Sequence, residues 1–429
     1  MDNTIFFERF GLNANNFVNK HYESVTIKDG KIYEAEEQYR LRMCPNCCKT
    51  FMYVHSKRWV SIKLSTTIGL TEILRVKRIR YICPICKKTH TFELEGVPRN
   101  KVITNQITKS IQLEFYNIQS FSDIAARYGV SVQSVINIFD EATSFAPRRE
   151  LPEFLCIDEK GFEGDTFGKY CVVLSDFFSN NVIDVLPDRQ MPFLEQYFSN
   201  ISVEERRKVK VVISDMYEGY SSIRDKYFPN ALFVIDLFHV VKLLTNAVNK
   251  IRIRTYNQIA IEDTIERHFM KNKWKVFLTD QFKITKDYYH SVKYDIYIPY
   301  NQIIQNCIKM NDAFWDGYMI LQELIHYKKY NTFQESLKFI DRIIARLNTS
   351  GDELLEKVAT TYSKWRIGIA NGLAKNQTGR RFSNSIAENN NSHIQKVINV
   401  AYGYRNFKRF RARVMLILSY KRIKVGSHW

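Results

Sequence analysis

The sequence contains no run of about eighteen apolar residues, no signal peptide with its hydrophobic segment and no lipidation motif. These absences predict a cytoplasmic protein with no membrane partner. The chain also lacks a Walker A loop, a Gly-x-Gly-x-x-Gly fingerprint and a Gly-x-Ser-x-Gly elbow, so a metabolic enzyme is poorly supported.

Acidic residues are scarce relative to basic ones. The chain has 45 Asp and Glu against 63 Lys and Arg, a formal net charge of +18. An excess of this size favours a polyanionic partner, and nucleic acid is the first candidate. With 429 residues, 45% of them apolar, the chain is long enough for several domains, each with its own core.

Four of the eight cysteines form two Cys-x-x-Cys pairs, Cys44–Cys47 and Cys83–Cys86. Two such knuckles can supply the four thiolates of one closed, structural zinc site, and the strand-like run over residues 73–81 suggests that a hairpin brings them together. The alternative is two unrelated turns that carry reduced thiols. Three further side chains are competing ligands: Cys48, His55 and His90.

Residues 121–136 have the outline of a helix-turn-helix. Apolar residues recur at helical spacing, a glycine lies at the turn, and Ser131 is the expected N-cap of the second helix. That helix would present Gln133, Ser134 and Asn137 to DNA. The alternative is an ordinary helical hairpin in a core.

From residue 151 the pattern changes to strands. Five are expected, over residues 154–158, 169–177, 182–186, 209–214 and 231–235. Three strands in a meander, then helix, strand, helix and strand, is the order of an RNase H-like core, in which the first and fourth strands are neighbours. Asp158 and Asp215, each expected to close its strand, would then lie side by side.

A third acid, Glu388, is expected near the start of a later helix. It follows a long stretch between residues 245 and 375 that we interpret as a helical insertion without strand alternation. Two strand-end aspartates and a helical glutamate would form a cage for divalent metal ions, the plan of a two-metal phosphoryl-transfer site. The alternative is that these acids are solvated caps or loop residues.

Over essentially its full length the chain resembles the ISL3 family of insertion-sequence transposases. The resemblance rests on the double Cys-x-x-Cys module, the helix-turn-helix, and the segments 157–159, 214–217 with Tyr220, 235–242, 383–384, 388–391 and 401–407. It implies that Asp158, Asp215 and Glu388 form a DDE triad in an RNase H-like domain. That triad would bind two Mg²⁺ ions, for which Mn²⁺ can substitute.

The resemblance predicts a bacterial DNA transposase. Such an enzyme would bind the terminal inverted repeats of its element and catalyse metal-dependent strand cleavage and strand transfer. Its partners would be double-stranded DNA, both the element ends and the target. It would act on DNA as a homodimer. It would be cytoplasmic and nucleoid-associated when bound to DNA. Two alternatives remain: a catalytically silent, domesticated DNA-binding protein, and an RNase H-like nuclease that cuts without joining.

Two further sets of residues are candidates for the site. Asp236 and His239 follow the fifth expected strand, and we favour a helix cap for the aspartate and a packing or hydrogen-bonding role for the histidine over direct chemistry. The segment 402–424 has eight cations, no acid and interleaved aromatic residues, which predicts aromatics in the core and cations toward DNA phosphates. The DNA-binding candidates in this segment are Arg405, Lys408, Arg409, Arg411 and Arg413.

The expected architecture is a multidomain α/β protein with five segments. These are a zinc-ribbon-like module over residues 1–95, a helix-turn-helix region over 96–150, the first part of the RNase H-like core over 151–245, the helical insertion over 246–375, and the catalytic helix with the basic carboxyl-terminal segment over 376–429.

Overall fold

The structure is a computed structural model that divides into two compact units. One unit contains residues 1–147 and 394–420, and the other contains residues 148–393. The described residues are 4–18, 22–27, 30–67, 70–98, 101–144, 148–166, 168–258, 264–284, 287–327, 332–376, 379–382 and 385–418. Within these ranges no helix is long and apolar enough to cross a membrane.

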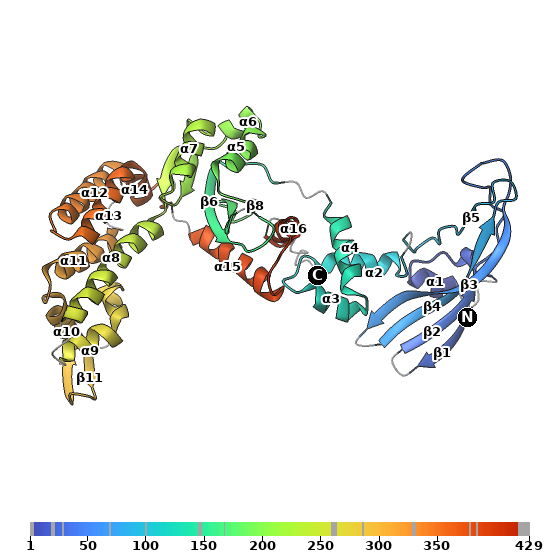
Figure 1. Ribbon diagram of the computed structural model, residues 1–429, viewed down its shortest axis with the longest axis horizontal. Coiled ribbons are helices and arrows are strands. Elements are labelled where there is room, and N and C mark those ends of the chain that lie inside the picture. The colour runs from blue at the N-terminus through green and yellow to red at the C-terminus, as the bar shows by residue number, and fades with distance from the viewer. Residues whose placement is uncertain are drawn as a thin grey trace. The chain divides into compact units, whose positions relative to one another are not determined.

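The first unit begins with a sheet in the order β1-β2-β4-β3, with β5 paired to β4 (Figure 1). Its strands are β1 Glu23–Ile27, β2 Gly30–Glu36, β3 Tyr53–Thr67, β4 Leu70–Ile82 and β5 Thr89–His90. Helix α1 (Thr4–Arg9) contributes Phe7 to the core of this sheet. The antiparallel pairing of β3 with β4 is the hairpin expected between the two cysteine pairs.

Four helices complete the first unit: α2 Asn105–Glu114, α3 Phe121–Tyr128, α4 Val132–Ala142 and α16 Phe407–Leu418. The expected helix-turn-helix is α3 and α4. Between them Gly129 adopts φ 58°, a left-handed conformation that glycine accepts without steric cost, and the Ser131 side chain caps α4. The carboxyl-terminal helix α16 shares their core through Ala412.

The second unit is built on a five-stranded sheet in the order β10-β9-β6-β7-β8. The strands are β6 Phe154–Gly161, β7 Tyr170–Asp176, β8 Val182–Leu186, β9 Val211–Ser214 and β10 Leu232–Ile235. Strands β7 and β8 continue antiparallel from β6, whereas β9 is parallel to both β6 and β10. The first and fourth strands are therefore neighbours, as the sequence predicted.

Strand β6 is longer than expected. Asp158 was expected to be its last residue, but β6 continues to Gly161, which pairs with Tyr170 of β7. The pairing of β6 with β9 ends earlier, at Cys156. Asp158 therefore lies within a strand, at the point where one neighbouring strand ends and the other continues.

Helices surround this sheet and form the segment that follows it (Figure 1). They are α5 Met191–Ser199, α6 Val203–Arg207, α7 Glu218–Tyr227, α8 Leu237–Gln258, α9 Ile265–Asn272, α10 Tyr300–Ile308, α11 Asp312–Ile325, α12 Phe333–Asn348, α13 Glu353–Lys364, α14 Arg366–Leu373 and α15 Ser385–Val400. The insertion was expected to lack strands. It contains a short hairpin of β11 (Tyr288–Ser291) and β12 (Ile296–Pro299), four residues each, too short to give a clear alternating pattern.

The end of the insertion packs back onto the sheet. A Cβ atom added at Gly372 of α14 would lie 2.4 Å from the carbonyl oxygen of Ile235 on β10, so only glycine permits this approach. The side chain of Asn371 donates to the carbonyl oxygen of Phe233, also on β10, at 2.9 Å. Helix α14 thereby supports the strand that leads to Asp236.

Candidate active site and DNA interface

Three aspartates lie at corresponding positions of three adjacent parallel strands. Cys156 of β6 pairs with Ile213 of β9, and extending this register by two residues places Asp158 opposite Asp215. On the other side of β9 the last pair is Ile235 with Ser214, and the backbone N–H of Asp236 donates to the Ser214 carbonyl at 2.9 Å. Asp236 therefore follows next to Asp215.

All three side chains are assigned to one face of the sheet. Cys156, Ile213 and Val234 share a hydrophobic cluster, and side chains alternate along a strand, so the aspartates two residues further along face the same way. Helix α15 lies on this face. Asn390 of α15 donates to the Ser175 hydroxyl at 3.0 Å, and Asn391 donates to Asp158 Oδ2 at 2.7 Å.

Glu388 lies in the first turn of α15, as expected, with an exposed side chain. It is three residues before Asn391, so the two side chains are on the same side of the helix. Electrostatic interactions connect Glu388 with Asp158, Asp236 and Lys242. The helix thus brings a carboxylate from the distant end of the chain to the aspartates on the sheet.

Burial and the neighbouring negative charges raise the pKa values of the three carboxyl groups. A cation beside them would stabilise their ionised forms. Burial, with a contribution from Asp236, raises the pKa of Asp158 to about 6. Burial, followed by the charges of Glu159 and Asp158, raises the pKa of Asp215 to about 7. Partial desolvation, followed by the charge of Asp236, also raises the pKa of the more exposed Glu388. Clustered acids with raised pKa values in a polar site are a common property of functional centres.

The donor set fits divalent cations. Asp215 Oδ1 is buried and accepts no hydrogen bond from the part of the chain that the structure describes. Carboxylate oxygens are the ligands preferred by Mg²⁺, and a cation would offset the cost of burying this one. Asp158, Asp215 and Glu388 do not, however, lie within 4.8 Å of one another as a group; among the described residues only four thiols do.

The contacts of Asp236 and His239 are compatible with the roles that the sequence favoured, a helix cap and a packing residue. Asp236 is 1% exposed, and its Oδ1 accepts the backbone N–H of Phe238 at 3.2 Å, which caps the start of α8. His239 Nε2 lies 3.8 Å from Asp236 Oδ2, too far for a hydrogen bond, and its ring packs edge-on against Phe238. Burial lowers the pKa of His239.

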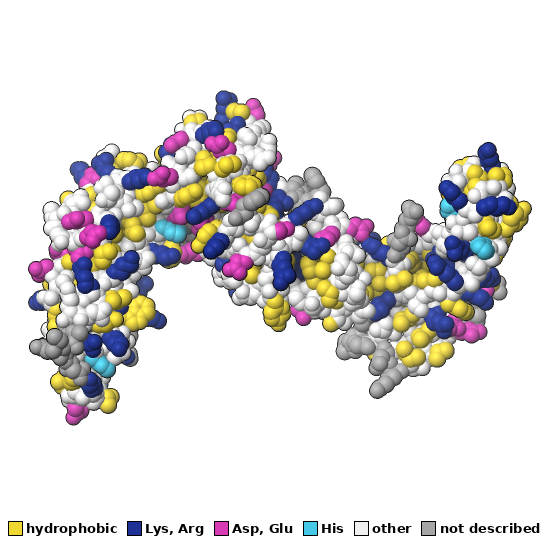
Figure 2. All heavy atoms as spheres, viewed as in Figure 1, with side chains coloured by type: hydrophobic (Ala, Val, Ile, Leu, Met, Phe, Trp, Pro, Cys, Tyr) yellow, Lys and Arg dark blue, Asp and Glu magenta, His cyan; other side chains and the backbone are white. Residues whose placement is uncertain are grey.

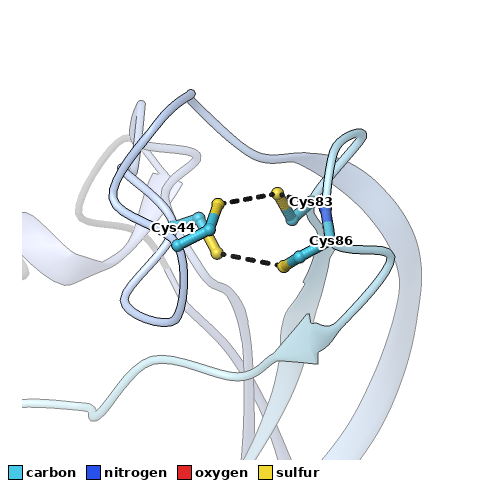
Figure 3. A group of neighbouring side chains, drawn as sticks. Cys44, Cys83 and Cys86 are labelled. Atoms are coloured by element: carbon cyan, nitrogen blue, oxygen red, sulfur yellow. Dashed lines mark hydrogen bonds between the residues drawn. The ribbon is translucent and has the colours of Figure 1, made fainter.

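The four predicted zinc ligands converge. The sulfur atoms of Cys44, Cys47, Cys83 and Cys86 all lie within 4.8 Å of one another (Figure 3). Cys44 Sγ is 3.6 Å from Cys86 Sγ, and Cys47 Sγ is 3.6 Å from Cys83 Sγ. Four sulfurs about 2.3 Å from one tetrahedral zinc would be about 3.8 Å apart, whereas a disulfide needs about 2.05 Å. The competing ligands Cys48, His55 and His90 are not in this group.

The pKa values of the two thiols in the first knuckle shift in opposite directions. The backbone N–H of Lys49 opposes the shift of Cys47, but burial and the neighbouring thiols raise its pKa to about 11. The N–H of Cys47 lowers the pKa of Cys44 to about 6, an effect that burial of the thiol opposes. The ionised thiolate is the form that binds zinc. The geometry of the cluster is compatible with a zinc module.

Two of the three predicted recognition residues on α4 are available to a partner. Gln133 and Asn137 are exposed and joined by a hydrogen bond of 2.7 Å between their side chains. Ser134 is half-buried, and its backbone N–H donates to Ser131 Oγ at 3.1 Å, so it also takes part in the helix cap.

The carboxyl-terminal cations fall into different groups. Arg405 and Lys408 are exposed, Arg411 is half-buried, and Arg409 forms an ion pair with Asp140 of α4 at 2.7 Å. Among the aromatic residues of this segment Phe410 is fully buried, Tyr404 and Phe407 are half-buried, and Tyr402 is exposed. The cations at positions 421, 422 and 424, and the family segment 383–384, lie outside the described residues.

Arg413 requires a correction. It was predicted to contact DNA, but its side chain is fully buried. Its guanidinium donates to the carbonyl oxygens of Phe115, Asn117 and Gln119 at 2.8 to 2.9 Å. The guanidinium donates its hydrogen bonds to backbone carbonyl oxygens between α2 and α3, so it is not available to a DNA phosphate.

Sequence reasoning missed two residues beside the acids. Asn391 lies in the family segment 388–391, and its amide donates to Asp158 Oδ2. Arg189 follows β8 and forms an ion pair with Glu159 at 2.8 Å. For Asn391 the helical spacing from Glu388 was an available signal; for Arg189 no local pattern indicates the partner, because 30 residues separate it from Glu159.

Comparisons with known proteins show similarity to transposases. The model of the ISL3 family of DDE proteins, described as a transposase, matches residues 155–414, more than half of the chain. The chain is also 22% identical over 382 residues to the protein called transposase for insertion sequence element IS1001 from Bordetella parapertussis. That match covers 87% of this chain and 88% of the relative.

Proposed function

Because the chain belongs to the ISL3 family of DDE transposases, we propose that it binds the terminal inverted repeats of its insertion sequence and catalyses DNA strand cleavage and strand transfer. The observation that carries this proposal is the register of the sheet, which aligns Asp158 with Asp215 while Asn391 ties the helix of Glu388 to Asp158. Three distant segments thereby supply carboxylates to one face of one sheet.

We interpret this sheet as an RNase H-like core. Its support is the strand order β8-β7-β6-β9-β10, in which the first three strands form an antiparallel meander and the last two are parallel to the first. Helices α8 to α14 then form an insertion between the last strand and α15.

Asp158, Asp215 and Glu388 are the proposed catalytic acids, and they would hold two Mg²⁺ ions, or Mn²⁺ in their place. Bound Mg²⁺ supplies Lewis acidity, which activates a water or a DNA 3′-hydroxyl and stabilises the departing oxygen of an in-line displacement. The protein residues would orient this reaction: Asn391 fixes the Asp158 carboxylate, and the buried Asp215 Oδ1 would offer a ligand atom that accepts no hydrogen bond from the described residues. No side chain is needed as a nucleophile.

The first unit is the proposed reader of the element ends. Gln133 and Asn137 on α4 have the donors and acceptors needed for base edges, and Arg405 and Lys408 would contact phosphates. Lys and Arg side chains are spread over the displayed face of both units, with fewer acidic ones among them (Figure 2). We propose that the protein binds element ends and target DNA as a homodimer, because two ends must be paired.

Strand cleavage and joining on DNA that carries the sequences flanking the gene tests this function. In the presence of Mg²⁺ the wild-type protein should cut at the 3′ ends of the element and join them to target DNA, and Asp215→Asn should do neither while it still binds. Binding without cutting by the wild type would favour the silent DNA-binding protein. Cutting without joining would favour the nuclease.

A further inference from the structure

Arg189 is held rigidly beside the proposed catalytic acids. Its Nη1 donates to both carboxylate oxygens of Glu159, at 3.0 and 2.8 Å. Its guanidinium carbon lies 5.2 Å from the ring centroid of Tyr170 and 5.1 Å from that of Tyr217. A guanidinium that contacts two aromatic rings and a carboxylate has little rotational freedom left to lose when it binds a ligand.

The neighbours of Arg189 fix its place relative to the acids. Glu159 directly follows Asp158, and Tyr217 is two residues beyond Asp215. The positive charge of Arg189 also counteracts the rise in the pKa of Asp215. The cation is therefore anchored by the residues next to two of the three proposed metal ligands.

Pairing with Glu159 uses only part of Arg189. Glu159 Oε1 also accepts the hydroxyl of Tyr220, at 3.1 Å. The Nε and Nη2 groups of Arg189 make no hydrogen bond with any residue that the structure describes. The Arg189 side chain is 40% exposed, against 15% for Glu159, so part of it is accessible from solvent beside a cluster of acids.

From this geometry we propose that Arg189 is a binding residue for a DNA phosphate next to the bond that is cut. This rests on the proposed function, because the anion brought to these carboxylates is then a phosphodiester. The fork of Nε–H and Nη2–H matches two non-bridging phosphate oxygens. A fixed cation there also offsets the repulsion between the carboxylates and the DNA backbone, which otherwise disfavours entry of the strand.

Methylphosphonate interference tests the phosphate contact directly. Element-end DNA is prepared with one neutral methylphosphonate at each position around the cleavage point, and affinity is measured without added Mg²⁺, so that no cutting is needed. The variants are Arg189→Ala and Arg189→Lys. The matched control is Arg366→Ala, which removes a half-exposed arginine paired with Asp341 at 2.9 Å, on the helical insertion.

The wild type should lose about tenfold in affinity at one or two adjacent positions, the effect of a charge-assisted hydrogen bond. Arg189→Ala should bind unmodified DNA about tenfold more weakly and lose nothing further at those positions, as expected for two groups that interact with each other. Arg189→Lys should recover part of the affinity because it keeps the charge, and Arg366→Ala should match the wild type.

An Arg189→Ala protein that keeps the wild-type pattern of interference would overturn the proposal and leave Arg189 as a compensating charge for the acids. A wild type with no sensitive position near the cleavage point would overturn it equally. The proposed function can fail separately. If the interference pattern appears but the wild type neither cuts nor joins DNA with Mg²⁺, the phosphate contact is supported and the proposed strand cleavage and transfer are contradicted.

Discussion

At the scale of single residues, one amide connects the elements that supply the proposed catalytic acids. Asn391 Nδ2 donates to Asp158 Oδ2 at 2.7 Å and to the Glu159 carbonyl at 3.3 Å. Its Oδ1 is buried and accepts no hydrogen bond within the described part of the chain. The side chain therefore fixes both the rotamer of Asp158 and the position of α15, on which Glu388 lies.

Replacing Asn391 by Ala should lower the rate of DNA cleavage about tenfold to hundredfold, since it removes a hydrogen bond to a charged group worth about 1.5–3 kcal/mol. Binding of Mn²⁺, followed by electron paramagnetic resonance, should weaken in parallel. The matched control is Asn389→Ala, an exposed residue of the same helix, which should leave both unchanged. Equal effects of the two substitutions would contradict the role given to Asn391.

The aspartates also predict how stability depends on pH. The folded pKa values of Asp158 and Asp215, about 6 and about 7, lie above the usual value of 3.8, so the folded state binds more protons than the unfolded state in this range. Without divalent metal, stability should fall as pH rises from about 4 to about 7, by about 1.4 kcal/mol per unit of pKa shift at most.

Thermal unfolding of metal-free protein at pH 5 and pH 8 measures this effect. Asp215→Asn should reduce the loss of stability at pH 8, because the neutral amide needs no proton. Added Mg²⁺ should stabilise the wild type more at pH 8 than at pH 5, since only the ionised carboxylates bind it well. A melting temperature that rises with pH in both proteins would refute the burial of these charges.

At the scale of elements, helix α16 shows how one basic segment divides its cations between two tasks. Arg413 is buried and donates to three carbonyls between α2 and α3, whereas Lys408 is exposed on the first turn. The sequence alone treats both as equivalent positive charges. Only their position relative to the core of the first unit separates a structural cation from a candidate for phosphate binding.

Arg413→Met should destabilise the protein by a few kcal/mol, because it leaves buried carbonyl oxygens without donors, each worth about 1–3 kcal/mol. Lys408→Ala should leave the melting temperature almost unchanged and lower the slope of log affinity against log salt by about one. Unfolding monitored by circular dichroism, with DNA binding titrated at several salt concentrations, distinguishes the two. Similar melting temperatures for both variants would argue against the buried role of Arg413.

At the scale of the whole molecule, the two units have separate hydrophobic cores. In the first unit the four thiols form a cluster with Ile79 and Tyr81 of β4. Structural zinc sites contribute directly to folding, so the cysteine cluster should stabilise the first unit and not the second.

The purified protein should contain about one equivalent of zinc, and Cys83→Ser should lose it. Its unfolding should then separate into two transitions, with the first unit melting at the lower temperature. The exposed Cys48 provides the control. Cys48→Ser should keep the zinc and should unfold in a single transition, as expected for the wild type. Full zinc content in the Cys83 variant would exclude it as a ligand.

The sequence by itself determined the features that depend on local pattern. These include the two cysteine knuckles, the turn at Gly129 with the Ser131 cap, and the five strands of the second sheet in their order. The knuckles, the turn and each single strand follow from residues within about twenty positions of one another, where periodicity and turn chemistry act directly. The strand order followed from the succession of strands and helices along the chain. The neighbouring positions of Asp158 and Asp215 followed from strand order, and extending the register of β6 with β9 by two residues beyond Cys156 and Ile213 is consistent with them.

Only the tertiary structure decided the contacts between segments that are distant in the chain. It extended β6 beyond Asp158, buried Arg413 against carbonyls almost 300 residues away, and placed Asn391 on Asp158 across 233 residues. It also added the β11–β12 hairpin to the insertion and paired Arg189 with Glu159. Such contacts depend on packing and hydrogen-bond satisfaction in the folded core, and no local pattern of residue types specifies them.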